Sequence, residues 1–371
     1  MEHISLRAYR AHQAVVLTFL ILFFFKSFIT SGEFDSNFID KEIVALNGLM
    51  LLYVGYSFFI ATLLEKIIFS FFSLLFIMNI ATGNGDYLFG VVFNISFLVL
   101  FRRLHLYHGC EIFVAAYFFS AIFMVAPYLL YSGSFVYFDE RYGDRLTLGF
   151  HNPNTMAYYL FSLFTMALCL LDKSRFEKPA RNLVAFIISL ILTPILAYSY
   201  SRTYLVLSLL LLLLFLISPL FHLSPGTKTC RILMLSLLAF QFFSVILWGI
   251  NPDIDALVNK ALTGRIWFSW KMFQSLGPPN LLFGGNIESY KPIDFFYFAM
   301  SYSAGILSSS ILLYIYYKLL GNMPELSVFM RWVVVFYLFT TLTETYFLVP
   351  VFNISLLLLY GQKNINTQLM R

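Results

Sequence analysis

Three charged residues at the edges of long apolar runs are the first candidates for chemistry. They are Arg202 in AYSYSRTYLVL, Arg265 in LTGRIWFSW and Asp294 in YKPIDFFYFAMSYSAG. A guanidinium group binds phosphate through two parallel, charge-assisted hydrogen bonds, and a carboxylate can accept a proton from a reacting hydroxyl group. The competing interpretations are that the two arginines contact lipid headgroups and that Asp294 caps a helix.

The stretch LGFHNPNTMAYYLF adds polar groups at the start of another apolar run. Asn152 is a good helix cap, and Pro153 is favoured at the first helical position. Capping explains neither His151 nor Asn154. We therefore expect these two side chains to face a substrate, with the Asn154 amide bonding a polar ligand such as a sugar.

Three more residues could bind substrate. Arg145 lies shortly before the histidine stretch, Lys271 follows Arg265, and Glu344 lies in TLTETY. Lys271 adds positive field, although a solvated helix face also explains it, and Glu344 is expected to pair with one of the arginines. The sequence has no zinc spacing, glycine-rich phosphate loop or Ser–His–Asp arrangement, so we expect no metal and no cofactor.

Composition places these residues in a membrane. Hydrophobic residues make up 60% of the 371-residue chain, charged residues only 12%, and the mean hydropathy is +0.80. Each crossing takes about 20 apolar residues, so the length suits an all-α polytopic protein of about twelve spans, with ten as the lower bound. The net charge of +5 follows from topology and does not predict a nucleic-acid partner, and the three cysteines do not predict disulfides.

Twelve apolar runs are expected to cross the membrane within a single domain, 1–371. The first lacks a small-residue cleavage site, so we expect a span and not a signal peptide. The third, fourth, eleventh and twelfth are short for a full crossing. The runs are 14–31, 42–64, 67–82, 87–101, 111–131, 153–171, 183–199, 203–221, 231–249, 295–317, 329–343 and 346–360.

Orientation follows from the distribution of positive charge. With a cytoplasmic N-terminus, most of the 24 lysines and arginines fall on the inner side, as the positive-inside rule requires. Both termini are then cytoplasmic, and the loops 132–152 and 250–294 lie outside, on the expected active-site side. The larger loop contains an amphipathic helix from Asp253 to Phe273, which Asp253 or Asp255 could cap.

Five short segments, taken in order along the chain, resemble the O-antigen polymerase and ligase superfamily. They are most similar to the Wzy-type repeat-unit polymerases. Ligases of this superfamily typically carry a His-Asn pair where the large loop meets the next span, whereas this chain has Asp294-Phe295, as in many polymerases. The matching segments are GFHNPNTMAYYLF, YSYSRTYLVL, LTGRIWFSW, LFGGN and IDFFYFAMSYSAGIL.

The resemblance implies a metal-independent glycosyltransferase in the bacterial cytoplasmic membrane. It would join oligosaccharides carried on undecaprenyl diphosphate into a surface polysaccharide (O-antigen, capsule or exopolysaccharide), beside a flippase and a chain-length regulator. Arg202 and Arg265 would stabilise the leaving diphosphate. Asp294, or less favourably His151, would accept the hydroxyl proton, while Asn154 and Arg145 would position sugar or phosphate.

Three other functions remain open. A ligase of the same superfamily would transfer finished glycan to a lipid or protein acceptor. A polyprenyl-phosphate-sugar glycosyltransferase would need a large first outer loop, and the segment 31–42 is too short for that. A lipid-oligosaccharide flippase or another transporter is the third, although we see no matching pair of broken helices in two halves.

Overall fold

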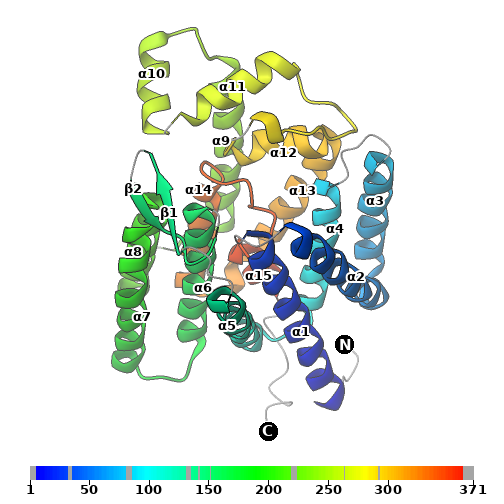
Figure 1. Cartoon of the computed structure of the whole chain (residues 1–371), viewed down its shortest axis with the longest axis vertical. Coiled ribbons are helices and arrows are strands. Elements are labelled where there is room, and N and C mark those ends of the chain that lie inside the picture. The colour runs from blue at the N-terminus through cyan, green and yellow to red at the C-terminus, as the bar shows by residue number, and fades with distance from the viewer. Residues whose placement is uncertain are drawn as a thin grey trace. The chain divides into compact units, whose positions relative to one another are not determined.

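The computed structural model describes residues 6–31, 36–80, 86–130, 135–140, 143–150, 152–218, 224–262, 264–290 and 293–361. Apart from one short β-hairpin, the regular secondary structure of these residues is helical (Figure 1). The all-α expectation is therefore confirmed, with that hairpin as an addition. The α-helices are α1 Leu6–Ser31, α2 Ser36–Ile60, α3 Leu63–Ile80, α4 Asp86–Arg102, α5 Leu106–Leu130, α6 Pro153–Lys173, α7 Lys178–Tyr198, α8 Arg202–Ile217, α9 Thr227–Ile246, α10 Pro252–Ala261, α11 Arg265–Leu276, α12 Phe296–Ala304, α13 Ile306–Leu319, α14 Val328–Thr340 and α15 Ile354–Tyr360.

The protein has the helices of an integral membrane protein. Among the described residues, six helices are long and apolar enough to cross a bilayer, and three shorter apolar helices accompany them. The expected tenth span is divided into α12 and α13, and the expected twelfth contains only the seven-residue α15. At about 1.5 Å per residue, none of these three pieces is as long as a bilayer core is thick. The count of twelve spans and the position of the termini stay predictions.

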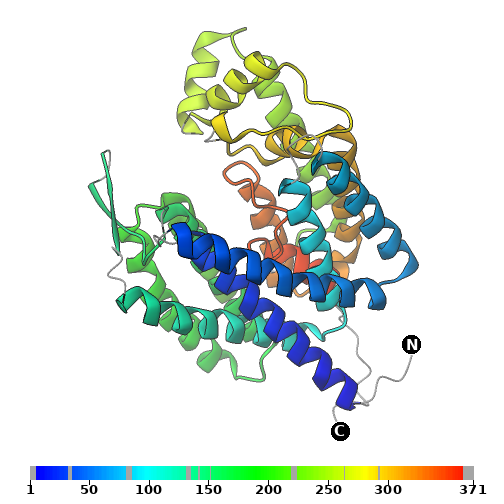
Figure 2. The ribbon, with the colours of Figure 1, turned by 45° about the vertical axis from the view of Figure 1, so that its right-hand side comes forward.

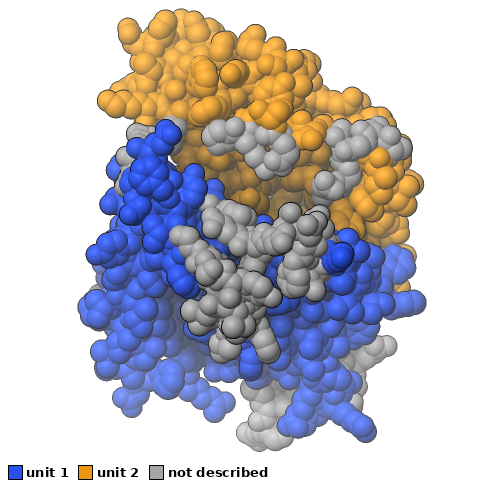
Figure 3. All heavy atoms as spheres, viewed as in Figure 1, with its two compact units in different colours: residues 1–60, 99–223, 361–371 blue, residues 61–98, 224–360 orange. Residues whose placement is uncertain are grey.

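The chain forms two compact units (Figure 3). Unit 1 comprises residues 1–60, 99–223 and 361–371, and unit 2 comprises residues 61–98 and 224–360.

Within unit 1, α6 packs against α5, α7 and α8, so its apolar side chains are mostly buried. Aromatic rings join α6 to its neighbours: Tyr159 of α6 lies 5.3 Å from Phe28 of α1, and Tyr158 stacks on Tyr204 of α8 at 5.0 Å. Asn152 caps the start of α6 by accepting a hydrogen bond from the Asn154 backbone N–H, and Pro153 is the first helical residue. The capping prediction is thus confirmed.

The loop expected at 132–152 contains a β-hairpin of β1 Val136–Asp139 and β2 Gly143–Leu146. The strands are antiparallel, with Tyr137 opposite Arg145 and Asp139 opposite Gly143. Strands this short carry little sequence signal. The hairpin matters because it holds Arg145 against the helices of unit 1.

In unit 2, the break between α12 and α13 falls at Gly305, whose φ of +81° favours glycine. The segment 280–285, here called the strap, runs along this break. The carbonyl oxygens of Asn280 and Leu281 accept hydrogen bonds from the N–H groups of Ile306 and Leu307, over 3.0 and 2.9 Å. The strap therefore satisfies backbone groups that the start of α13 leaves without helical partners.

The large loop 250–294 holds two helices and not one. The expected helix from Asp253 to Phe273 ends at Ala261 and restarts at Arg265, because Gly264 adopts a left-handed conformation (φ +91°) that interrupts the helical path. Asp255, in the first turn of α10, accepts a hydrogen bond from the Gly249 N–H over 2.7 Å. The yellow and yellow-green ribbons of α10 and α11 lie together at one end of unit 2, next to α12 (Figure 2).

Candidate active site

Two of the predicted site residues form an ion pair in unit 2. Arg265 is the first residue of α11, and its Nε lies 2.9 Å from the Asp294 carboxylate, just before α12. Their side chains are 18% and 30% exposed, although Arg265 Nε itself is buried. Beneath them, Ile266 and Ile293 belong to a buried cluster that packs α11 on α12. The pair therefore rests on a fixed apolar base.

The start of α12 is held by groups from two other helices. Its N-cap residue, Phe295, has no capping side chain. The Phe296 N–H donates instead to the Thr341 carbonyl oxygen at the end of α14, over 3.0 Å, and the Tyr297 N–H donates to Gln241 Oε1 of α9, over 2.9 Å. The interpretation of Asp294 as the cap of this helix is therefore wrong, since its carboxylate faces Arg265 instead.

Burial raises the pKa of Asp294 above its usual value, and the charge and hydrogen bonding of Arg265 oppose that shift. Removal from water disfavours a charged carboxylate, whereas a neighbouring cation favours it. Because burial prevails, the Asp294 carboxylate binds a proton more readily than an exposed carboxylate would. That is the property expected of a general base.

Unit 2 also contains a cavity of about 310 Å³, whose lining includes neither Arg265 nor Asp294. Ile293, the residue before Asp294, and Thr345, the residue after Glu344, both line it. None of the lining residues carries a charge. The polar ones are Tyr87 and Asn94 of α4, Ser303 of α12, and Thr345 and Tyr346 after α14. Neutral hydrogen-bonding groups beside aromatic faces suit an uncharged polar ligand.

Other predicted residues of unit 2 have different surroundings. Lys271 is exposed, and its ammonium group lies 5.3 Å from the ring centre of Trp267, one helical turn earlier. Glu344 is half-buried in the segment after α14, and its backbone N–H donates to the Thr340 carbonyl oxygen. Its pairing with an arginine stays a prediction.

In unit 1, Arg145 and Asn154 meet at a second cluster, which includes the turn between α7 and α8. Arg145 donates from Nε to the Ser199 carbonyl oxygen, from Nη1 to Asp139 and from Nη2 to Asn154 Oδ1, over 2.9, 2.9 and 3.0 Å. Ser201 Oγ donates to the same Asn154 oxygen over 2.9 Å. We call these five residues the Arg145 cluster.

Arg145 and Asn154, the two predicted residues in this cluster, differ in exposure and in hydrogen bonding. The Arg145 side chain is 8% exposed, and all three of its nitrogens bond to the protein. Asn154 is exposed, and its Nδ2 donates to no residue that the structure describes. Arg145 is therefore suited to hold Asn154 in place, while the Asn154 amide is suited to meet a ligand.

Arg202 directly follows the cluster as the first residue of α8, and it is exposed. Tyr200, two residues before Arg202, has a φ of +55°, which is unusual for a residue with a side chain. Strain of this kind gathers at functional sites. His151 lies outside the described residues.

Sequence reasoning missed two polar side chains that the fold uses. Gln241 is the one amide side chain in the apolar stretch LLAFQFFSVI, and that was its only signal. Glu65, three residues after Thr62, forms a capping box at the start of α3, with Thr62 N–H donating to its carboxylate over 2.7 Å. The three-residue spacing of Thr62 and Glu65 could have revealed this capping box in the sequence.

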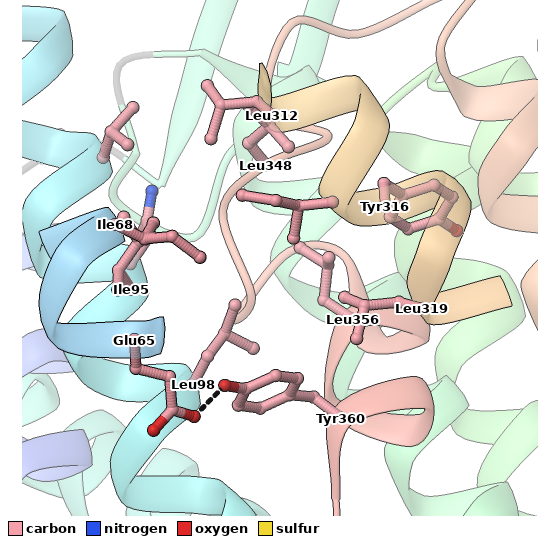
Figure 4. A pocket seen from close by; sticks show the side chains of 13 residues that line it. Glu65, Ile68, Ile95, Leu98, Leu312, Tyr316, Leu319, Leu348, Leu356 and Tyr360 are labelled. Atoms are coloured by element: carbon pink, nitrogen blue, oxygen red, sulfur yellow. Dashed lines mark hydrogen bonds between the residues drawn. The ribbon is translucent and has the colours of Figure 1, made fainter. Parts of the chain in front are cut away.

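Glu65 also lines a small apolar cavity of about 80 Å³ in unit 2 (Figure 4). Its carboxylate accepts a hydrogen bond from the Tyr360 hydroxyl group at the edge of that cavity. Leu98, Leu312 and Leu356 supply apolar walls. The cavity has no group suited to chemistry other than this satisfied carboxylate.

Among the described residues, no group of three His, Cys, Asp or Glu side chains could hold a metal ion. The three cysteines are free and buried.

No protein-family model, curated protein or solved structure matches this chain.

Proposed function

We propose that the protein polymerises oligosaccharide repeat units carried on undecaprenyl diphosphate, at the outer face of the bacterial cytoplasmic membrane. The observation that carries this proposal is the pairing of Arg265 with Asp294 at 2.9 Å, with both side chains partly exposed. A cation for the diphosphate and a base for the acceptor are the two groups that this transfer requires.

The reaction forms one bond and breaks one. A hydroxyl oxygen of the acceptor sugar attacks the anomeric carbon of the donor, and the bond from that carbon to the diphosphate oxygen breaks. The electron pair leaves with the diphosphate, where the guanidinium of Arg265 stabilises the developing negative charge. Asp294 accepts the hydroxyl proton. No oxidant, reductant, metal or cofactor is needed for this balance.

Arg265 also sets the basicity of Asp294. Its charge lowers the pKa of the carboxyl group that burial raises. As Arg265 turns toward the diphosphate in the transition state, Asp294 loses part of that stabilisation and becomes a stronger base. Proton acceptance and departure of the leaving group are thereby coupled through one ion pair.

The uncharged cavity that Ile293 and Thr345 line is the proposed place for a sugar ring of the acceptor. Its volume of about 310 Å³ is at the lower end of ordinary ligand sites. Asn94, Ser303 and Thr345 can bond sugar hydroxyl groups, and the rings of Tyr87 and Tyr346 offer apolar faces.

The Arg145 cluster and Arg202 are proposed to bind glycan and phosphate from unit 1. Asn154 would bond a sugar through its exposed amide, and Arg202 would bind a diphosphate group. We further propose membrane lipids, a flippase and a chain-length regulator as partners.

The test replaces Arg265 by Gln and, separately, Asp294 by Asn, and analyses lipid-linked glycans in cells with matched protein levels. Lys260→Gln serves as the control, because Lys260 is an exposed cation on the neighbouring α10. We expect single repeat units to accumulate outside without polymer in both variants, and normal polymer in the control.

The same experiment separates the competing functions. Repeat units that stay on the cytoplasmic side would identify a flippase. Polymer that forms but is not transferred to its final acceptor would identify a ligase. Normal polymer in both variants would refute the proposed site.

A further inference from the structure

A third cavity, in unit 1, lies at the far end of α6 from Asn154. It measures about 540 Å³ and is formed by the turn between α4 and α5 and the turn between α6 and α7. Lys173, at the end of α6, lines it. Lys173 lies nineteen positions after Asn154 in this helix, which is about 28 Å at 1.5 Å per residue. The cavity is thus distinct from the Arg145 cluster.

The lining of this cavity is rich in basic groups and has no acidic residue. Lys173 and Arg175 come from one turn, and His105 and His108 from the other. Neither Lys173 nor Arg175 forms an ion pair with any residue that the structure describes. Glu111, whose carboxylate lies 2.9 Å from His108 Nδ1, does not line the cavity.

His105, which lines the cavity, has a buried ring nitrogen that could bind a ligand. Its Nδ1 is shielded from solvent and has no hydrogen-bond partner among the described residues. Burial, and then the nearby charges of His108 and Lys173, hold the pKa of His105 below its usual value. An anion between these groups would relieve their mutual repulsion and give the buried nitrogen a partner.

The first turn of α5 adds backbone donors at the same place. The helix begins at Leu106, and its first N–H groups have no helical acceptor. Tyr107 and His108 of that turn both line the cavity. The positive end of the helix dipole favours an anion there.

We propose that this cavity binds a phosphate group. Lys173 and Arg175 supply donors from one side, and the start of α5 supplies them from the other. The phosphate can belong to an anionic phospholipid headgroup or to a soluble phosphate. This proposal is independent of the polymerase function, since it uses none of the residues assigned to glycosyl transfer.

A general excess of positive charge on one side of the membrane is the competing explanation, because it needs no site. Lys178 distinguishes the two. It is an exposed cation at the start of α7, close in sequence to Lys173 and Arg175, but it does not line the cavity. A site depends on the lining residues, whereas diffuse attraction depends equally on all three.

The experiment uses the purified full-length chain with three variants: Lys173→Gln with Arg175→Gln, His105→Gln, and Lys178→Gln. One arm measures inorganic phosphate binding in maltoside micelles by ³¹P line broadening. The other counts phosphatidylglycerol molecules retained in native mass spectrometry, against phosphatidylcholine. Helical content and thermal unfolding verify that each variant is folded.

We expect the double variant to weaken phosphate or phosphatidylglycerol binding by about tenfold or more, because it removes two charge-assisted contacts. His105→Gln should weaken it by a smaller factor, and Lys178→Gln should leave it unchanged. If the double variant weakens only phosphatidylglycerol binding, the ligand is a lipid headgroup. If it weakens inorganic phosphate binding, the ligand is a soluble phosphate. Equal losses in the double variant and Lys178→Gln, or no binding in either arm, would overturn the proposal.

Discussion

Gln241 Oε1 accepts a hydrogen bond from the Tyr297 backbone N–H over 2.9 Å, while Gln241 Nε2 donates to the Thr341 carbonyl oxygen over 2.8 Å. Gln241 is fully buried. One side chain thus joins α9 to the start of α12 and the end of α14, and thereby fixes the backbone that leads into Asp294.

Replacing Gln241 by Leu should destabilise the protein by about 3 kcal/mol, because it leaves the buried Tyr297 N–H without its partner and deprives the Thr341 carbonyl oxygen of one donor. Unfolding in a mixed-micelle titration would measure this. Ser244→Ala on the same helix is the control, since it removes only a local bond to the Gln241 carbonyl oxygen. Equal, small effects of the two substitutions would contradict the role assigned to Gln241.

The pH dependence of polymer formation should reflect Asp294. The base is active when deprotonated, so activity falls as the pH falls through its pKa, which burial places above the usual carboxyl value. Arg265→Gln removes the group that lowers this pKa, so the acidic limb of the residual activity should move to higher pH. A pH–rate profile of the purified protein and of the Arg265→Gln variant measures the acidic limb of each. An acidic limb that stays in place or moves to lower pH would argue against Asp294 as the base.

Gly284 and Gly285 provide a matched pair. A Cβ at Gly284 would lie 1.8 Å from the Ser303 carbonyl oxygen, whereas a Cβ at Gly285 would meet nothing closer than 3.9 Å. Gly284→Ala should therefore destabilise unit 2 by about 3 kcal/mol through overpacking, and Gly285→Ala should be nearly neutral. Thermal unfolding of both variants tests this. A tolerated Gly284→Ala would mean that the strap does not pack tightly on α12.

Arg145→Lys should loosen the Arg145 cluster. A lysine cannot reproduce three bonds in fixed directions to Ser199, Asp139 and Asn154, so we expect a loss of about 2 kcal/mol in stability. Asp144→Asn is the control, because Asp144 is exposed on the same strand. Under the proposed function, the variant should also raise the donor concentration needed for half-maximal rate. Unchanged stability would show that the cluster is not needed to hold the hairpin.

Features that depend on neighbouring residues could be predicted from the sequence. Asn152 and Pro153 were identified as the start of α6 because capping is decided within a few residues. Arg265 and Asp294 were selected singly, because charge is conspicuous in an apolar chain. Their pairing was not predicted, since it depends on how α11 packs on α12 through buried residues such as Ile266 and Ile293.

Features that depend on tertiary contacts were misjudged. The tenth span was expected to be continuous, because its composition is apolar on both sides of Gly305. The break exists because the strap supplies acceptors at that point. Similarly, the periodicity from Asp253 to Phe273 continues through Gly264, although the chain turns there. Periodicity measures which residues face the core, and it does not detect a change in helix direction.

The strap also bears on the order in which the protein assembles. Lipid offers no acceptor for the N–H groups of Ile306 and Leu307, and the Gly284 N–H donates to Asn79 Oδ1 of α3 over 3.0 Å. The pair α12 and α13 therefore cannot settle in an apolar environment until the strap has joined it. Because the strap is anchored to α3, completion of this part of unit 2 waits on a helix made much earlier during synthesis, and it belongs among the last steps of insertion.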